Sequence, residues 1–134
     1  MINFQVKETK HDNSDFKAFM AENEADISHI FPHFSEEDAQ FGDILVLTHA
    51  DSIIGVVISQ TKGDELHIDV DYLIKKYRDQ GIGKAFFEKR LQDYQKKGIN
   101  SVIALTDNTV HINYLKEAGF TQSSLYPDRY ELVW

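Results

Sequence analysis

The segment Arg78-Asp79-Gln80-Gly81-Ile82-Gly83-Lys84-Ala85 (RDQGIGKA) lies between two patterns that predict different secondary structure. Before it, residues 65–74 alternate apolar and polar side chains, with the period of two that is typical of a β-strand. After it, apolar side chains recur at helical spacing as far as Gly98, where a helix is expected to end. Glycine at such a junction can leave several backbone N–H groups unhindered and pointing the same way. This arrangement favours an anion, above all a phosphate.

Two common phosphate-binding loops do not fit this segment. The loop of nucleoside triphosphatases has four residues between its glycines and a Lys-Ser or Lys-Thr pair after the second. Here a single residue separates Gly81 from Gly83, and Ala85 follows Lys84. A dinucleotide-binding fold would place a third glycine at the position of Phe86, after a parallel-strand unit. The spacing that remains is R-x-x-G-x-G.

The composition is that of an ordinary globular domain. The 134 residues, 42% hydrophobic and 27% charged, are enough for one domain with its own core, and we expect a single domain over residues 1–134. The absence of cysteine excludes disulfides and thiolate chemistry, and the six histidines show no metal-ligand spacing. The net charge of -8 argues against nucleic-acid binding and is compatible with cationic partners. Neither a signal peptide nor an apolar run of ~20 residues is visible, so we expect a cytoplasmic protein without membrane contact.

The rest of the chain predicts a mixed α/β domain with a mostly antiparallel sheet. Strands are expected at residues 2–7, 43–48, 53–59, 65–74 and 102–105, and in a final hairpin over 123–134 with its turn at 126–129. Helices are expected over about 14–31, about 35–38, 82–97 and 110–118. The aromatic residues at helical spacing that are expected in the core are Phe16, Phe19, Phe86 and Phe87.

The whole chain resembles the GNAT family of acetyl-CoA-dependent N-acetyltransferases. The resemblance rests on the R-x-x-G-x-G of residues 78–83 after the fourth strand, on Asn108, on Gly119-Phe120 at the end of the next helix, and on Gly55 in the third strand. It implies that the fourth and fifth strands separate into a V-shaped gap that holds acetyl-CoA. It also implies transfer of the acetyl group to a primary amine of a small molecule or a peptide, without a metal. Part of the substrate pocket could then come from the partner in a homodimer.

The resemblance also implies how the acyl donor is held. The pyrophosphate of acetyl-CoA would meet the N–H groups at the start of the helix, where a Cβ at position 81 or 83 would crowd it. Pantetheine would pair with the backbone of the fourth strand, and the helix asparagine would lie near the thiol. The residues given these cofactor roles are Leu73, Ile74, Arg78, Asp79, Gln80, Gly81, Ile82, Gly83, Lys84 and Asn108. These groups would serve any acyl-CoA, so another acyl donor is an alternative.

Acyl transfer to an amine needs a neutral amine, a stabilised oxyanion and a proton for the leaving thiolate. Glu65, His67, Asp69 and Asp71 are expected on one face of the fourth strand, beside the proposed cleft. Glu65 matches the general base of some family members, and an imidazole such as His67 is a credible base. Asp69 and Asp71 could bind a cationic amine or relay its proton. A solvated outer face of the sheet is the alternative for each of the four and is favoured for His67 or Asp69 taken singly; the catalytic hypothesis rests on the run of four beside the proposed cleft.

The helix after the fifth strand departs from the family pattern. Many relatives carry a tyrosine, as a general acid toward the thiolate, where this chain has Leu115; Tyr114 stands one place earlier, ~100° away around the helix. Tyr114 is therefore either a catalytic candidate or a wall of the cleft, and Tyr126 or Tyr130 could supply the acid instead. His111 occupies a place that the family usually gives to a small residue. Leu115 and His111 favour, as an alternative, a non-catalytic acyl-CoA sensor or interaction module. A structural domain whose glycine turn binds nothing is a further alternative.

Overall fold

One sheet of seven strands forms the centre of the molecule, and the structure, a computed structural model, describes residues 2–134. The strands are β1 (Gln5–Thr9), β2 (Asp43–His49), β3 (Ser52–Lys62), β4 (Glu65–Leu73), β5 (Ser101–Leu105), β6 (Thr121–Gln122) and β7 (Arg129–Val133). The helices are α1 (Ser14–Glu22), α2 (Glu24–Ile30), α3 (Glu36–Phe41), α4 (Ile82–Lys96) and α5 (Thr109–Glu117), with a 3₁₀ turn at Lys75–Tyr77. The strand order is β1-β2-β3-β4-β5-β7-β6, in which β4 and β5 run parallel and the other neighbours antiparallel. This confirms the predicted fold class.

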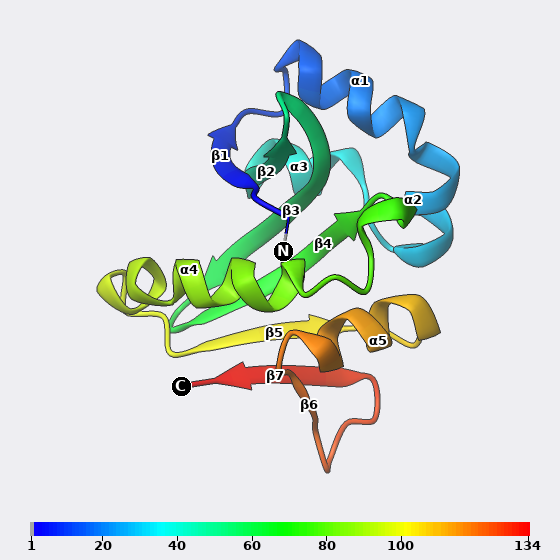
Figure 1. The fold of residues 1–134 in the computed structure, drawn as a ribbon. Coiled ribbons are helices and arrows are strands. Elements are labelled where there is room, and N and C mark those ends of the chain that lie inside the picture. Colours follow the sequence, from blue (N-terminus) through cyan, green and yellow to red (C-terminus); the bar gives the residue numbers. More distant parts are fainter. Residues whose placement is uncertain (1) are drawn as a thin grey trace.

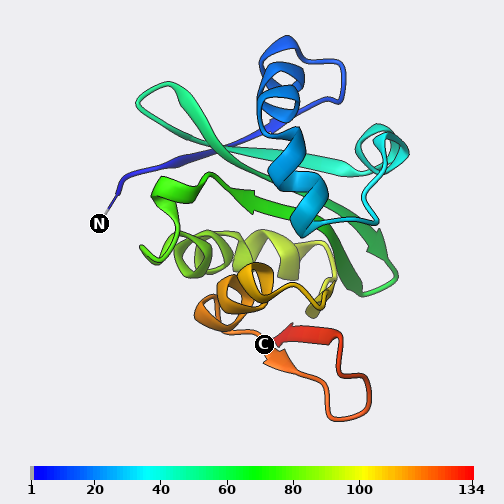
Figure 2. The same ribbon diagram turned by 90° about the vertical axis from the view of Figure 1, so that its right-hand side faces the viewer.

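The helices cover both faces of the sheet. Figures 1 and 2 show α4 and α5 on one side of the central strands and α1 to α3 on the other. Phe86 and Phe87 are buried in the core beneath α4 and α5, and Phe16 and Phe19 in the core beneath α1 to α3. The expectation that these four aromatic residues are core residues is therefore confirmed. Among the described residues, no helix is both long enough and apolar enough to cross a membrane.

Several element boundaries differ from the prediction: β3 and α3 extend further, to Lys62 and Phe41, and three other differences have a local structural reason. The helical segment expected over 14–31 is two helices, because Asn23 ends α1 and begins α2 and its side chain donates to the carbonyl of Phe19 at 2.8 Å. The first strand is Gln5–Thr9 rather than 2–7, because its pairing with β2 starts at Gln5, opposite Thr48. The last hairpin begins with Thr121–Gln122, since the Ser123 hydroxyl accepts two backbone N–H groups and starts the turn.

The β4 strand contains a bulge that decides which side chains reach the site. Ile58 of β3 pairs with Val70, and Ser59 pairs with Ile68, so Asp69 is an extra residue in β4. Because side chains alternate along a strand, one extra residue turns every later side chain to the opposite face. Accordingly, Ile68 lies in the core beneath α4 and α5, whereas Val70 lies in the core beneath α1 to α3.

The bulge separates Asp71 from the other polar residues of β4. Asp71 is buried on the α5 side, where it meets His111, whereas Glu65, His67 and Asp69 precede or occupy the bulge and are only partly buried. The prediction that all four residues share one face of the strand is therefore wrong for Asp71. Its cause is the inserted residue, which the strict alternation of the sequence conceals.

The fourth and fifth strands separate as expected. Their parallel pairing runs from Glu65 opposite Ser101 to Ile68 opposite Ala104 and then stops. Beyond Ile68, within the described chain, β4 is paired with β3 but has no partner on its β5 side. Figure 1 shows the two arrowheads pointing apart. The predicted V-shaped gap is confirmed, and it opens at the bulge.

Candidate functional site

The loop before α4 presents a row of unused backbone donors. Gly81 is the N-cap residue of α4, with φ of 74°, and Asp79 also has a positive φ, of 63°. No atom of residues 2–134 accepts a hydrogen bond from the backbone N–H groups of residues 79–84. These donors and the positive end of the helix dipole together form a suitable cradle for a phosphate.

Glycine occupies positions 81 and 83 of the loop for different structural reasons. Gly81 has a left-handed backbone, and a Cβ built on it would meet nothing within 4 Å, so the side that faces a ligand is open. A Cβ on Gly83 would lie 2.8 Å from two carbon atoms of the Tyr114 ring. Gly83 therefore lets α5 approach α4, which is a packing reason for glycine at position 83; that a Cβ there would also crowd a pyrophosphate stays a prediction.

Arg78 fastens the loop to the rest of the protein. Its guanidinium donates to the carbonyl of Leu73 and to the carboxylate of Asp26, each at 2.9 Å, and lies over the Tyr72 ring. The Tyr72 hydroxyl donates to the same carboxylate at 2.7 Å. This hydrogen bond and the nearby Arg78 lower the pKa of Asp26, while burial and the Asp26 carboxylate raise the pKa of Tyr72 to about 12. The side chain of Arg78 thus holds the loop in place, and the loop backbone is what remains available to an anion.

A cavity of about 290 Å³ lies between the end of β4 and α5; we call it the β4–α5 cavity. Arg78 and Asp79 line it at the loop end, and Asp71, His111 and Tyr114 line it elsewhere. It therefore runs from the first residues of the loop to the part of β4 that has no partner on its β5 side. A pantetheine arm bound in it would run beside the unpaired edge of β4.

The backbone of β4 offers hydrogen bonds to this cavity at alternate residues. The N–H of Ile74 donates to the carbonyl of Ile54 at 3.0 Å, so it points toward β3. Because alternate residues of an antiparallel strand direct their N–H groups to opposite sides, those of Asp71 and Leu73 point away from β3, toward the gap. Of the two backbone positions expected to face pantetheine, Leu73 is directed toward the cavity and Ile74 is not.

His111 and Asp71 meet across the β4–α5 cavity. The Nε2 atom of His111 contacts Oδ1 of Asp71, and the two side chains are 3% and 0% exposed. The ring of His111 also packs edge-on against Phe31, with centroids 4.7 Å apart. Sequence reasoning noted both residues but did not join them; the signal was a histidine at a position where a small residue was expected.

The tyrosine candidates occupy different surroundings. Tyr114 lines the β4–α5 cavity, and burial, together with the charge of Asp71, raises its pKa well above the ordinary value, so its hydroxyl stays protonated. Tyr126 is exposed in the last turn, and Tyr130 is buried in the core. Leu115, at the usual place of the tyrosine, is fully buried. Tyr114 is thus the tyrosine of this group that reaches the cavity.

Asn108 stands at the start of α5 as its N-cap residue. Its side-chain oxygen accepts from the N–H groups of Val110 and His111, at 2.9 and 3.2 Å. This cap orients the first turn of α5, which carries His111. The side-chain oxygen of Asn108 is therefore engaged in capping, and a contact of this residue near the thiol stays a prediction.

A second cavity, of about 470 Å³, opens between β4 and β5; we call it the β4–β5 cavity. Phe31 lines it as well as the β4–α5 cavity, so the two adjoin at this ring. Its charged lining is mainly acidic: Asp38, Asp69, Asp107 and Asp128, with Lys62, His33 and His67.

Two polar residues of β4 differ in their relation to this second cavity. Asp69 lines it and accepts from the side-chain amide of Gln60 at 2.9 Å, and burial raises its pKa. Glu65 is instead engaged by His67 at 3.1 Å and by Arg129 at 3.3 Å, and it does not line the cavity. Of the two carboxylates, Asp69 is therefore the one placed to meet a substrate.

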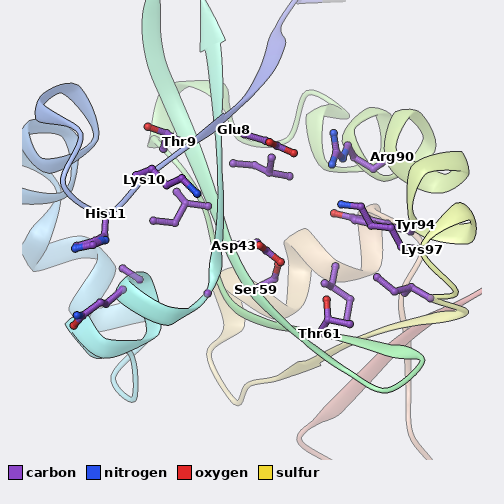
Figure 3. Close-up of a pocket in the computed structure, with 17 residues that line it drawn as sticks. Glu8, Thr9, Lys10, His11, Asp43, Ser59, Thr61, Arg90, Tyr94 and Lys97 are labelled. Carbon is purple, nitrogen blue, oxygen red and sulfur yellow. The ribbon is translucent and has the colours of Figure 1, made fainter.

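A third cavity, of about 440 Å³, lies away from the loop. Figure 3 shows Arg90, Tyr94 and Lys97 on one side of it and Lys10 and His11 on the other. The three residues come from the last turns of α4 and its C-cap, and the 15 residues of this helix span ~22 Å. None of the loop residues 78–84 lines this cavity. In the part of the chain that the structure describes, no cluster of three or more His, Cys, Asp or Glu could hold a metal ion.

These features, a phosphate cradle at a helix start and a cavity beside two separated parallel strands, agree with a comparison of sequences. The sequence model of the acetyltransferase (GNAT) family matches residues 8–120. The chain belongs to the GNAT family. No curated protein matches the chain in sequence.

Solved structures of other GNAT proteins share the fold. The PaiA N-acetyltransferase of Thermoplasma acidophilum, in complex with coenzyme A, matches with a TM-score of 0.72 and 14% identity, over 99% of this chain and 100% of its own. The GNAT domain of PAT from S. lividans matches with a TM-score of 0.75 and 18% identity, over 98% and 90%. The ribosomal-protein-S18-alanine N-acetyltransferase of Escherichia coli matches with a TM-score of 0.64 and 16% identity, over 98% and 94%. At these identities the likeness shows the fold.

Proposed function

We infer that this GNAT chain transfers an acetyl group from acetyl-CoA to a primary amine of a small molecule or a peptide, by direct attack of the amine nitrogen on the thioester. One observation carries this proposal: the β4–α5 cavity, which reaches the loop at Arg78 and Asp79, adjoins the acidic β4–β5 cavity at Phe31. An acyl donor in the first and an amine in the second would meet where the two strands separate.

The donor side is assigned to backbone groups. The N–H groups of residues 79–84 would bind the pyrophosphate, and those of Asp71 and Leu73 would bind the pantetheine amides. Arg78 keeps the loop in the required shape through Asp26, and a solved GNAT structure of the same fold contains coenzyme A. Acetyl-CoA is thus the proposed acyl-donor substrate. It supplies an activated thioester, and the protein supplies the geometry.

The acceptor side is assigned to the aspartates of the β4–β5 cavity. Asp38, Asp69, Asp107 and Asp128 surround it with a single lysine, Lys62, and attract a cationic substrate. The names of structurally similar proteins include N-acetylglutamate synthase and a ribosomal-protein alanine acetyltransferase, so the fold serves both small and peptide amines. We therefore assign the acceptor by charge: an amine with at least one positive group that stays ionised while the attacking nitrogen is neutral.

A non-catalytic acyl-CoA sensor is the second candidate, and one observation favours it. Leu115 is fully buried at the place where many relatives have the tyrosine acid, so that position supplies no hydroxyl. Such a sensor would use the same cradle and cavity for binding and would release no thiol.

One assay separates these functions. The purified protein is mixed with acetyl-, succinyl- or longer acyl-CoA and with polyamines, amino sugars, amino acids and short peptides, and free thiol is followed with a thiol reagent. We expect release with acetyl-CoA and a cationic amine. Binding of CoA without release for every amine would identify a sensor, release with another acyl-CoA would revise the donor, and no binding at all would leave a structural domain.

A matched pair of glycine variants tests the cradle. Gly81 and Gly98 lie just before and just after α4, both with positive φ and with no atom within 4 Å of a built Cβ. Alanine at either position should cost similar stability, about 1 kcal/mol. Only Gly81→Ala places a methyl group where the phosphate approaches, so we expect it to weaken CoA binding about tenfold or more and Gly98→Ala to leave binding unchanged. Equal affinities in calorimetry would remove the loop from the binding site.

A further inference from the structure

We propose that His111 and Asp71 form the proton-transfer pair of the acetyl transfer, with His111 as the catalytic residue and Asp71 as the residue that positions it. The inference rests on the proposed function, because it needs an amine and a thioester to react in the adjoining cavities. It assigns the reaction a proton carrier that does not depend on a tyrosine at position 115.

The position of the pair supports this role. Asp71 follows the bulge of β4, at the start of the unpaired edge, and His111 lies in the first turn of α5, opposite. Both line the β4–α5 cavity, and the His111 ring packs against Phe31, which also lines the acidic cavity. The imidazole therefore lies at the boundary between the proposed donor and acceptor cavities.

The energetics argue against a purely structural pair. Apart from their mutual contact, neither nitrogen of His111 and neither oxygen of Asp71 has a hydrogen-bond partner among the described residues, and all four atoms are buried. A buried polar atom without a partner destabilises the folded state, and an apolar pair would fill the same space without that cost. The His67–Glu65 pair on the same strand is partly exposed and shared with Arg129. The buried pair thus retains hydrogen-bonding capacity for a group that the protein does not provide.

The contact with Asp71 determines how His111 would act. With Nε2 facing the carboxylate, the neutral imidazole carries its hydrogen on Nε2 and keeps Nδ1 as a proton acceptor. As the amine nitrogen bonds to the carbonyl carbon, Nδ1 takes one proton from that nitrogen. The C–S bond then breaks with its electron pair on sulfur, and Nδ1 returns the same proton to the thiolate. The products are the N-acetyl amine and the free thiol, and Asp71 stabilises the transient imidazolium.

Among the titratable side chains that face the β4–α5 cavity, His111 is the one suited to carry a proton. Facing it are Asp71 from β4, Tyr114 from the same helix and the apolar Phe31 from the end of α2. The other charged residues that line the cavity are Lys75, Arg78, Asp79 and Glu117. Carboxylates, amines and a buried phenol ordinarily keep one protonation state near neutral pH, whereas an imidazole exchanges protons there.

The decisive experiment replaces His111 in the intact protein. We expect His111→Ala to lower kcat about 10²- to 10³-fold, with CoA affinity within about threefold of wild type, because the proton carrier is lost and the cradle is untouched. Added imidazole should enter the vacated space and restore part of kcat. His111→Gln fills that space and should be equally slow without rescue, and His11→Ala, at an exposed position, should match wild type.

The second arm tests the positioning role of Asp71 and the pH dependence. Asp71→Asn keeps the size of the side chain, and we expect it to lower kcat about tenfold or more while the KM for acetyl-CoA stays near wild type. The acid limb of the kcat–pH profile should be present in wild type and absent in His111→Gln. Wild-type kcat in folded His111→Ala and His111→Gln, or slow variants that imidazole does not rescue and that keep the acid limb, would overturn the pair and leave the transferase standing. No turnover by wild type with any amine would overturn both proposals.

Discussion

Before Asp69, β4 is paired on both sides, whereas after Asp69 it is paired with β3 alone. In the first half the polar side chains are partly exposed and bind one another, as Glu65 and His67 do. In the second half Asp71 is buried against α5, and the Tyr72 hydroxyl binds Asp26 of α2. The same strand thus pairs on both sides and lines the β4–β5 cavity up to Asp69, whereas beyond Asp69 it has one free edge and lines the β4–α5 cavity.

The difference shows how little is needed to make a site in this fold. One extra residue exchanges the faces of everything after it and coincides with the end of the β4–β5 pairing. It brings a carboxylate to the α5 side and frees the backbone edge beside it. The loop with its glycines follows within ten residues, so the cradle and the edge are held by one continuous segment.

Deleting Asp69 should have the largest effect on stability, because it removes the residue that separates the two halves of β4. Without the extra residue, Val70 and Tyr72 would turn away from the core that buries them, and Asp71 would turn away from His111. We expect a loss of at least about 3 kcal/mol, because each buried apolar side chain contributes about 1.5–3 kcal/mol. Urea unfolding followed by circular dichroism measures it. Asp69→Ala retains the residue count and is the control; a deletion variant as stable as this control would show that the bulge does not set the faces of β4.

Much of the fold follows from periodicity in the sequence, and the bulge is what periodicity conceals. Ile68, Val70 and Tyr72 are apolar and alternate with Asp69 and Asp71, so the pattern continues unchanged through the extra residue. Because both faces of this sheet are covered by helices, an apolar residue is buried whichever way it points. The sequence pattern therefore indicated the strand and its length but not the change of face.

In the candidate site, too, some features follow from local sequence and others only from the structure. The loop was predictable, because a glycine with positive φ at a helix start is a local feature, read from neighbouring residues. The engagement of Arg78 with Asp26 and the meeting of His111 with Asp71 join residues 52 and 40 positions apart, and no local pattern indicates such pairs. His111 was noticed because it departs from the family, and its partner required the structure.

Removing the charge of Asp26, which binds Tyr72 in the second half of β4, should have an intermediate effect on stability. We expect Asp26→Asn to lose about 1 kcal/mol at pH 7 and to bind CoA more weakly, because Tyr72 and Arg78 lose a charged acceptor. The folded-state pKa of Asp26 is lowered from its usual 3.8, so its contribution is present above that pH and is lost as pH falls through the folded value. Urea unfolding of wild type and variant at several pH values should converge in acid.

Glu24→Gln is the matched control for this prediction, since Glu24 lies in the same turn of α2 and is exposed. It should change neither CoA affinity nor the acid dependence by more than a surface charge does. If Asp26→Asn behaves like Glu24→Gln, the anchoring of the loop through Arg78 is not a determinant of binding.

Neutralising Asp69 should have the smallest effect on stability, and the opposite sign. Burial raises the pKa of Asp69 above 3.8, so its ionised form is disfavoured in the folded protein; this cost is present above the folded pKa and disappears as pH falls through it. Asp69→Asn should therefore be more stable than wild type at pH 7 by a few tenths of a kcal/mol, since solvent screens a partly exposed group, and equal to it in acid.

The same change removes a charge from the acidic cavity, so the KM for a cationic amine should rise severalfold. Asp107→Asn, in the same cavity but more exposed, should raise KM without stabilising the fold. A gain in stability with an unchanged KM would mean that the charge of Asp69 does not contribute to amine binding. A raised KM would show that the residue inserted at the bulge also helps to bind the amine.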